Sequence, residues 1–449
     1  MRGITLIDYL LVPVYLFGIY IFAILLRNKL YSKNHPLRPY FIPALTIKLL
    51  GSLFIGLIYQ YYYNGGDTFE FFYHAQIINS SFMESPDIWL RLITHNADLT
   101  NIKDQYYLSQ MYWYDDLSSY TVSCLAAFIG IFCFSKYLII ASIFGVFSFS
   151  GAWVFYLCFV RQYPLLKKHL FIAIICVPSL VVWGSGLFKD TICMIALGWI
   201  TFTIFNLFEL LKFKWRYLII LLICVVLVYL IKSYILVSFL PFIILKTLLF
   251  HRKQVKINPA NRYAFIASIF IIVMVSVLSL NILRELLLSF SIENVVKTVV
   301  LQKDYLLRIS LEEGGSAYDL GNFEPTPMGL LEKAGPAINV ALFRPYFWES
   351  GSPLILFNAI EANLLLIFTL YLPLRKNIFK IFKQIYSDPN LIMCLGFSLL
   401  FAFFVGISSF NFGSLSRYRI PCVLFYALFL VILYYDKNDK KEESIVKED

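Results

Sequence analysis

Long apolar segments separated by short basic loops constrain the fold of this chain more than any other feature. Of its 449 residues, 59% are hydrophobic and only 15% are charged, whereas a soluble domain has about 25% charged residues. About eleven apolar segments approach the roughly 20 residues that a helix needs to cross about 30 Å of hydrocarbon. They are Leu6–Leu26, Phe41–Tyr62, Tyr137–Val160, Leu170–Leu187, Thr191–Leu210, Tyr217–Ile231, Tyr234–Phe250, Tyr263–Leu283, Pro353–Leu374, Leu391–Ser409 and Ile420–Tyr435. The sequence therefore predicts an all-α fold, a polytopic transmembrane helix bundle of about eleven spans.

The distribution of lysine and arginine predicts the direction of these helices. Five short loops are rich in both residues and contain almost no acidic residue apart from Asp388; they are 27–38, 161–168, 212–216, 252–262 and 375–388. Because such loops stay on the cytoplasmic side of a membrane, we expect the N-terminus outside and the C-terminus in the cytoplasm. The formal charge of +10 follows from the same bias, so we expect no nucleic-acid partner.

Segment 118–136 is the ambiguous part of this topology. Its apolar part, Thr121 to Phe134, is short. If it crossed the membrane, the basic loop at Lys167 would lie on the opposite side from Arg27. We therefore expect one interfacial or re-entrant segment in addition to the spans.

Two long loops, 64–117 and 284–351, face the outside in this topology. The first carries eight acidic residues against two basic ones. The tail 436–449 mixes lysine with glutamate and aspartate, and we expect it to be a disordered cytoplasmic end. All eight cysteines lie in apolar segments, so we interpret them as packing residues.

The first outer loop begins with a candidate catalytic group. Asp67 follows Gly65 and Gly66, which let the backbone turn. If a helix starts here, Asp67, Glu70 and His74 lie on one face of it. Asp67 is then a candidate general base, with Glu70 and His74 as orienting partners; the alternative is a helix-capping aspartate on a solvated face. We expect no metal or other cofactor, although these three side chains are also a possible ligand set for a divalent ion.

A second candidate group lies at the turn 183–190, between two predicted spans. The turn ends in Lys189 and Asp190, and a cation beside a helix N-terminus favours binding of an anion. Lys232 interrupts an apolar run near the same membrane face. We interpret Lys189 and Lys232 as phosphate-binding residues supported by Asp190. The alternatives are a Lys189–Asp190 pair that only ends a hairpin, and a Lys232 that extends to the membrane interface.

Three arginines in the second half of the chain are further candidates. Arg344 and Glu349 enclose an aromatic run typical of a membrane interface, and they either bind substrate or pair with each other. Arg417 and Arg419 precede the last apolar segment, and arginine suits bidentate phosphate contacts. Glu361 lies within a span, where we expect it to hydrogen-bond or complete an ion pair.

These residues indicate a phosphate-bearing, lipid-linked substrate. An ionisable group in hydrocarbon costs on the order of several kcal/mol unless it is paired or hydrated, so a carboxylate and several cations at one membrane face favour a functional site. The sequence contains no Gly-x-Ser-x-Gly element, nucleotide-binding loop or large cytoplasmic domain. Their absence from the sequence argues against a serine hydrolase, a nucleotide-sugar enzyme and an ATP-driven pump.

Four short elements carry a resemblance to known proteins: Gly-Gly-Asp-Thr at 65–68, Ser-Gly-x-x-Lys-Asp at 185–190, Arg-Pro-x-x-Trp-Glu at 344–349 and Arg-Tyr-Arg-x-Pro at 417–421. With an acidic residue in the first outer loop and cations at the outer ends of later spans, the chain resembles the GT-C superfamily of membrane glycosyltransferases. It is also similar to the related bacterial polysaccharide polymerases. The resemblance covers most of the chain as architecture, but only these elements in sequence.

The resemblance implies an enzyme of the bacterial cytoplasmic (inner) membrane that transfers a sugar at its outer face. The donor would be a polyprenyl-phosphate-linked sugar, and the acceptor a glycan, a lipid or a protein. Asp67 would be the base, and Glu70 is the best candidate for the second carboxylate that the family often has. The residues that would hold the lipid phosphate are Lys189, Lys232, Arg344, Arg417 and Arg419. Residues 1–435 would form a single transmembrane catalytic domain in contact with membrane lipid.

Two alternatives remain open. A polymerase or ligase of lipid-linked oligosaccharide repeats, in cell-surface polysaccharide synthesis, shares this chemistry but should depend more on the arginines. A lipid-linked oligosaccharide flippase or transporter forms no glycosidic bond. Transporters favour charges at the membrane midplane and often have internal repeats. The clustering of charges at one predicted surface and the lack of a visible repeat disfavour a transporter.

Overall fold

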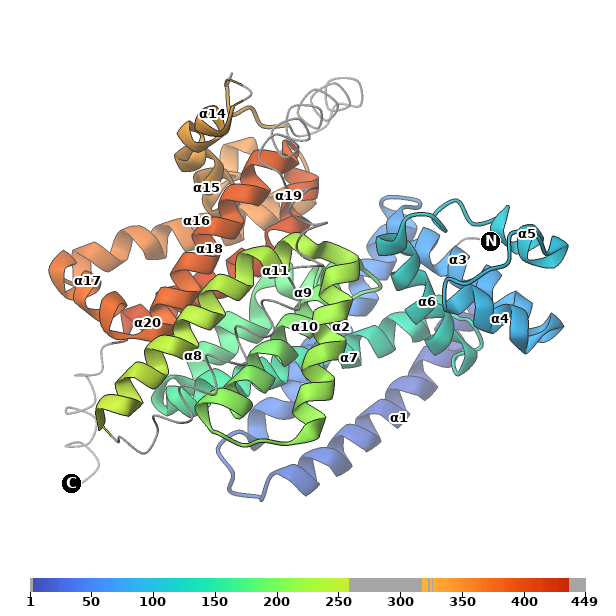
Figure 1. Cartoon of the computed structure of the whole chain (residues 1–449), viewed down its shortest axis with the longest axis horizontal. Helices are drawn as coiled ribbons and strands as arrows, with labels where there is room; N and C mark the ends of the chain where they lie inside the picture. Colours follow the sequence, from blue (N-terminus) through green and yellow to red (C-terminus); the bar gives the residue numbers. More distant parts are fainter. Residues whose placement is uncertain (1–2, 258–316, 322–323, 325, 436–449) are drawn as a thin grey trace. The chain divides into compact units, whose positions relative to one another are not determined.

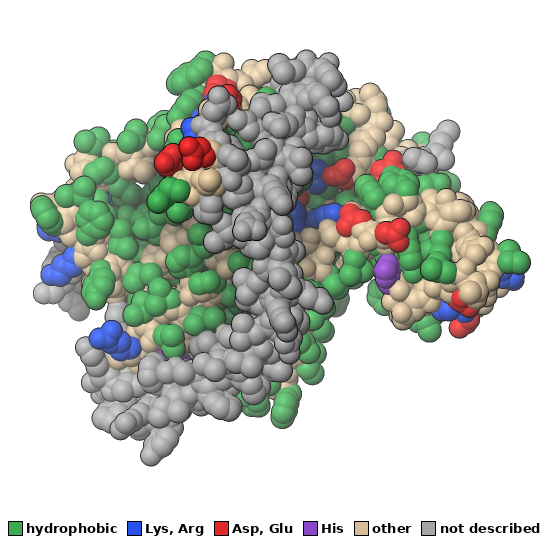
Figure 2. Space-filling model, turned by 45° about the horizontal axis from the view of Figure 1, so that its top comes forward, with side chains coloured by type: hydrophobic (Ala, Val, Ile, Leu, Met, Phe, Trp, Pro, Cys, Tyr) green, Lys and Arg blue, Asp and Glu red, His purple; other side chains and the backbone are tan. Residues whose placement is uncertain are grey.

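The computed structural model describes residues 3–257, 317–321, 324 and 326–435 (Figure 1). Within these ranges the chain folds into helices joined by turns, and an isolated antiparallel bridge pairs Ala317 with Asn411. Large apolar side chains are exposed along the long helices, for example Phe17 on the first of them. Hydrophobic side chains are also widespread on the face shown in Figure 2. Because hydrocarbon, unlike water, accepts such surfaces, this agrees with the predicted all-α membrane class.

Among the residues that the structure describes, seven helices are long and apolar enough to cross a membrane, and a bent pair would make an eighth. The seven are α1 (Leu6–Leu30), α2 (Arg38–Tyr61), α7 (Tyr137–Gln162), α10 (Lys189–Ile204) with its π-helical continuation η3 (Phe205–Glu209), α11 (Trp215–Ile257), α16 (Pro353–Arg375) and α18 (Pro389–Ser409). The bent pair is α19 (Phe412–Tyr418) and α20 (Ile420–Tyr434), with a bend of 62°. The protein is therefore of the multi-pass membrane type.

The expected count of eleven spans is not confirmed, and backbone breaks explain part of the difference. Segment 170–187 is not one helix, because α8 (Lys167–Phe171) passes into the π-helix η2 (Ile172–Cys176) and a new helix, α9 (Pro178–Val182), begins at a proline. Proline lacks the N–H that would continue the helical hydrogen bonding.

Two other expected spans, 217–231 and 234–250, are joined in α11. The backbone there leaves the helical conformation at Lys232, with φ −149° and ψ 73°. The expected span Tyr263–Leu283, residues 284–316 of the second outer loop and the tail 436–449 lie outside the described residues.

Short helices fill the first outer loop and the connections of the second half. In the loop they are α3 (Asp67–Glu84), α4 (Pro86–Ile93), α5 (Ile102–Leu108) and α6 (Leu117–Ile131). Later in the chain they are η1 (Pro164–Leu166), α14 (Pro327–Glu332), α15 (Ala334–Phe343), η5 (Phe347–Glu349) and α17 (Ile378–Ser387). The expected short apolar segment corresponds to α6, whose 15 residues extend for only about 22 Å.

The chain divides into two compact units, which we describe separately. Unit 1 comprises Met1–Cys158, Leu180–Phe202 and Ile219–Leu236. Unit 2 comprises Phe159–Ser179, Thr203–Leu218 and Val237–Asp449, as far as these are described. The helices α7, α10 and α11 each contribute residues to both units.

In unit 1, Asp8 joins the first turns of α1 and α7. Its Oδ2 accepts hydrogen bonds from the backbone N–H and the hydroxyl of Thr5, at 2.9 and 2.6 Å. Its Oδ1 accepts from the backbone N–H of Leu138 at 3.0 Å, so both helices begin at the same end of the unit. Further along, α7 and α10 approach closely, because a Cβ on Gly198 would lie 2.2 Å from the carbonyl oxygen of Gly151.

In unit 2, two of the predicted cytoplasmic loops meet at one end. The hydroxyl of Tyr163 donates to Asp388 at 2.8 Å, and Asn390 donates to the side chain of Gln162 at 2.9 Å. These contacts bring together the basic loops 161–168 and 375–388. Their common position agrees with the topology expected from the positive charges.

Candidate functional site

The candidate site in unit 1 begins where α2 passes into α3. Gly65 and Gly66 have φ angles of 147° and 117°, a region that L-residues rarely adopt. A Cβ on Gly66 would also lie 2.8 Å from the ring of Tyr59, so this position requires glycine. Gly66 is the N-cap of α3, and Asp67 is the first helical residue rather than the cap. The carboxylate of Asp67 therefore lies in the first turn of α3, at the N-terminal end of that helix.

Glu70 and His74 follow on α3 and are joined through Tyr112. The hydroxyl of Tyr112 donates a hydrogen bond to Glu70, and its ring packs edge-on against the imidazole of His74 with centroids 4.6 Å apart. The imidazole is fully buried and also contacts Trp113. His74 therefore packs in the interior of unit 1, whereas Asp67 and Glu70 are half-buried at its surface.

A cavity of about 350 Å³ opens at this first turn of α3. Its wall combines backbone, amide and carboxylate groups with one aromatic ring. The lining residues are Gly3, Ile4, Gln60, Asn64, Gly65, Phe69 and Glu70. A volume of this order is at the small end of known ligand sites, which run from about 300 to 1,000 Å³.

Lys189 is one of the two predicted cations that lie in this part of unit 1. Its Nζ is 3.5 Å from Oδ2 of Asp116, and 22% of its side chain is exposed. Asp67 and Lys232 are both close enough to act electrostatically on its charge. Lys189 also begins α10, so its ammonium and the helix N-terminus together form an electropositive surface.

Asp116 completes this cluster from the loop before α6. Burial acts to raise its pKa, but the hydrogen bond from Ser119 and the charge of Lys189 outweigh that effect, so its pKa lies below the ordinary value. The backbone N–H of Ser118 donates to the same carboxylate at 3.1 Å. Asp116 is therefore a fixed anion beside Lys189.

Asp190 and Lys232 form a nearly buried ion pair beside Lys189. The pair connects the first turn of α10 to the point where α11 leaves the helical conformation. A second contact holds the backbone just before Lys232: the hydroxyl of Ser118 donates a hydrogen bond to the carbonyl oxygen of Ile231 at 3.1 Å. Lys232 is thus engaged with Asp190, and its expected phosphate contact stays a prediction.

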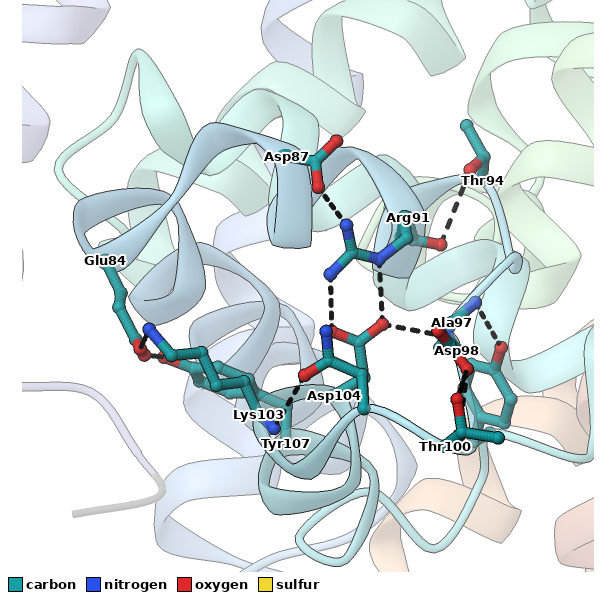
Figure 3. Close-up of polar contacts among 12 residues, drawn as sticks. Glu84, Asp87, Arg91, Thr94, Ala97, Asp98, Thr100, Lys103, Asp104 and Tyr107 are labelled. Atoms are coloured by element: carbon teal, nitrogen blue, oxygen red, sulfur yellow. Dashed lines mark hydrogen bonds and ion pairs between the residues drawn. The ribbon is translucent and has the colours of Figure 1, made fainter.

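A polar network holds the rest of the first outer loop in place (Figure 3). Arg91 on α4 donates from Nε and Nη2 to the two carboxylate oxygens of Asp104 on α5, at 2.9 and 2.7 Å. The same guanidinium pairs with Asp87. Around it, Glu84 pairs with Lys103 at 2.7 Å and accepts a hydrogen bond from Tyr107. The network fixes α3, α4 and α5 relative to one another.

In unit 2, Arg344 and Glu349 bind each other, which is one of the two expected alternatives. Nε of Arg344 donates to Oε2 of Glu349 at 3.0 Å, and the second nitrogen contact is shorter. The guanidinium also lies over the ring of Phe412, 5.4 Å from its centroid. Burial acts to raise the pKa of Glu349, but the hydrogen bonds from Arg344 and from the backbone of Tyr346 leave it below the ordinary value.

Arg419 is fully buried in unit 2, and the two terminal nitrogens of its guanidinium contact protein groups. It donates to the carbonyl oxygens of Arg344 at 2.5 Å and Asn358 at 3.2 Å. It also lies 3.5 Å from Glu361, whose other oxygen accepts the backbone N–H of Ser179 at 2.7 Å. The expected ion pair of Glu361 is therefore confirmed, and Arg419 holds the backbone at Arg344. Arg417, two residues earlier, is half-buried.

The structure thus groups the predicted residues in two sets. Unit 1 brings together Asp67, Lys189, Asp190 and Lys232, and unit 2 brings together Arg344, Glu349 and Arg419. Asp116 belongs to the first set but is not predicted from the sequence. Its position just before an apolar helix, as an N-cap, is the signal that points to it.

Three further charged residues inside apolar segments, Lys48, Glu209 and Lys246, are not singled out by the sequence analysis. Lys48 on α2 is buried and donates to the carbonyl of Leu180 at 2.8 Å. Glu209 and Lys246 form a buried pair in unit 2 at 2.5 Å. A lone charge in an apolar run is the signal that identifies such groups.

Within the described ranges, no three His, Cys, Asp or Glu side chains are placed to hold a metal ion. The eight cysteines are free thiols. No family model, no curated protein and no solved structure matches this chain.

Proposed function

We propose that this protein is an integral membrane glycosyltransferase that uses a polyprenyl-phosphate-linked sugar at the outer face of a bacterial cytoplasmic membrane. The observation that carries the proposal is the cluster in unit 1, where the partly buried ammonium of Lys189 lies 3.5 Å from the carboxylate of Asp116 and within electrostatic range of Asp67. A base and a cation side by side are what transfer from a lipid phosphate requires.

Lys189 is the proposed contact to the donor phosphate. Its 3.5 Å separation from Asp116 is longer than a well-formed charge-assisted hydrogen bond of about 2.8 Å. A phosphate oxygen would therefore compete with Asp116 for the ammonium of Lys189. The N–H groups at the start of α10 would add to the stabilisation of charge on the departing phosphate.

Asp67 is the proposed general base. Its carboxylate lies in the first turn of α3 and is half-exposed. An ionised carboxylate accepts the proton of an acceptor hydroxyl as the bond to the sugar carbon forms and the bond to the phosphate oxygen breaks. The cavity lined by Glu70, Gln60 and Asn64 lies at the same turn and is proposed to hold a sugar, whose hydroxyls need such polar partners.

Unit 2 contributes the observation that favours the second candidate, a polymerase or ligase of lipid-linked oligosaccharides. Arg344 is held by Glu349 through its side chain and by Arg419 through its carbonyl. A cation fixed in this way is suited to binding a pyrophosphate or phosphate. We assign Arg344 to substrate contact and Arg419 to positioning Arg344.

The proposal is tested by incubating the purified protein with a panel of polyprenyl-phosphate sugars and candidate acceptors, followed by mass spectrometry. A glycosyltransferase adds one sugar to the acceptor, and a polymerase gives a ladder of repeat units. Transfer by the wild type that is lost in Asp67→Asn supports the assignment. Movement of labelled lipid across liposomes without a new glycosidic bond would reject both candidates.

A further inference from the structure

The short helix α17 connects the end of α16 to the start of α18 in unit 2 (Figure 1). Its sequence, Ile-Phe-Lys-Ile-Phe-Lys-Gln-Ile-Tyr-Ser, separates into two faces at helical spacing. One face carries the isoleucines and aromatic residues. The other carries Lys380, Lys383, Gln384 and Ser387. A helix with such faces is suited to a boundary between apolar and polar surroundings.

Hydrogen bonds made by the polar face fix the rotation of α17 about its own axis. The side-chain amide of Gln384 donates to the carbonyl oxygens of Ile432 and Tyr435 at 3.3 and 3.4 Å. Just before α17, the ammonium of Lys376 donates to the carbonyl of Leu433 at 2.7 Å. These are the last carbonyls of α20, which lack partners within their own helix. The polar face is therefore held against the end of a helix of the membrane-spanning type.

Within the part of the chain that the structure describes, the aromatic side chains of the apolar face are exposed, whereas Ile381 and Ile385 are half-buried. The exposed fractions are 79% for Phe379, 64% for Phe382 and 84% for Tyr386. The exposed surface continues onto α16, where Leu374 is 83% exposed. Because α16 is a candidate span, its exposed apolar side faces lipid, and the apolar face of α17 extends that surface.

We propose that α17 lies in the plane of the membrane and binds anionic phospholipid on the cytoplasmic side. Phe379, Phe382 and Tyr386 insert between acyl chains, and Lys380 and Lys383 contact the headgroups. Charge complementarity selects anionic lipid, because both lysines are exposed and the described loop 375–388 contains Asp388 as its one acidic residue. Basic residues next to an apolar face are the usual basis of such binding. The inference does not depend on the proposed sugar transfer.

A pair of cysteine variants of the full chain tests the orientation. Phe382→Cys and Lys380→Cys lie on opposite faces of α17. Each is labelled with a fluorophore in liposomes of phosphatidylcholine and phosphatidylglycerol, and labelled wild type serves as the blank for the native cysteines. We expect nitroxide-bearing acyl chains to quench at position 382 and aqueous iodide to quench several-fold more strongly at position 380. Equal quenching by iodide at both positions would overturn the proposal.

Lipid selectivity is measured with the fluorophore at position 382 and nitroxide-labelled phosphatidylglycerol or phosphatidylcholine as quencher. We expect labelled phosphatidylglycerol to quench more strongly than labelled phosphatidylcholine. The selectivity for phosphatidylglycerol should fall roughly five-fold for each lysine replaced, in Lys380→Gln and in Lys383→Gln. The matched control is Lys212→Gln/Lys214→Gln, an exposed basic pair in another loop. If the control reduced the selectivity equally, or if the wild type had none, specific binding at α17 would be excluded.

Discussion

Lys232 and Asp190 form a nearly buried ion pair although 42 residues separate them in the sequence. Only 8% and 5% of their side chains are exposed. Lys232 is also the residue at which α11 leaves the helical conformation, so the break in the backbone coincides with the charge contact. Since Asp190 follows Lys189 directly, the pair fixes the start of α10, where the proposed phosphate contact lies.

Breaking this pair is expected to destabilise the protein strongly. Lys232→Met or Asp190→Asn leaves a buried partner without its counter-charge, which typically costs about 3–5 kcal/mol. The double variant Lys232→Met/Asp190→Leu removes both charges and should recover most of that loss. Thermal unfolding of the detergent-purified protein measures both effects. Two single losses that simply add in the double variant would show that the residues are not coupled.

Asp67→Asn is expected to lower sugar transfer by about 10²–10⁴-fold, because the amide cannot accept the proton of the acceptor hydroxyl. The fold and the membrane insertion should be unchanged, since the side chain is half-exposed. The matched control is Asp115→Asn, an exposed carboxylate of the same loop. Transfer rates from labelled donor decide the assignment, and undiminished activity of Asp67→Asn would remove Asp67 as the base.

Residue patterns within a single helix are the part of the structure that the sequence predicts well. The apolar lengths locate α1, α2, α7, α16 and α18 to within a few residues, because a span needs a fixed length of apolar side chains. The glycines before Asp67 mark the start of α3 for a local reason, their positive φ angles. The buried partner of Glu361 is expected from the cost of a lone charge in a span.

Contacts between distant parts of the chain are much harder to predict. Nothing local shows that Lys232 reaches Asp190, or that the two terminal nitrogens of Arg419 donate to the carbonyls of Arg344 and Asn358. The broken segment 170–187 has the composition of a span, and its π-helical turn reflects packing rather than hydropathy. Composition gives the length of an apolar segment, whereas tertiary packing decides whether it forms one helix.

The first outer loop is expected to stay folded in mild acid and to open below about pH 4. The hydrogen bonds from Arg91 hold the pKa of Asp104 below its ordinary value. A carboxyl group whose pKa is lower in the folded state contributes stability above its unfolded pKa of about 3.9, and this contribution disappears as the pH falls through the folded value.

Limited proteolysis of the loop as a function of pH checks this expectation. Resistance should be constant from about pH 7 to 5 and fall below about pH 4. Asp104→Asn should be cleaved faster at neutral pH, because Arg91 loses its bidentate partner. The matched control is Asp115→Asn, an exposed carboxylate of the same loop. A wild-type loop that opened between pH 7 and 5 would contradict the role of Asp104.

Arg419→Lys is expected to destabilise unit 2 and to reduce activity beyond the loss of folded protein. A lysine ammonium cannot reach the carbonyls of Arg344 and Asn358 as the two arms of the guanidinium do. The unmet buried carbonyls should cost about 2–3 kcal/mol. Arg417→Lys, at a half-buried position two residues away, is the control and should cost less than about 1 kcal/mol.

The kinetic part of this prediction separates positioning from stability. If Arg419 orients the backbone at Arg344, Arg419→Lys should lower kcat at temperatures where the variant is fully folded, because the guanidinium of Arg344 is then less well placed for the developing phosphate charge. Circular dichroism gives the folded fraction, and transfer rates at saturating donor give kcat. Arg344→Lys should lower kcat too, and the two substitutions should be less than additive if they act on the same contact. A normal kcat for folded Arg419→Lys would leave Arg419 a purely structural role.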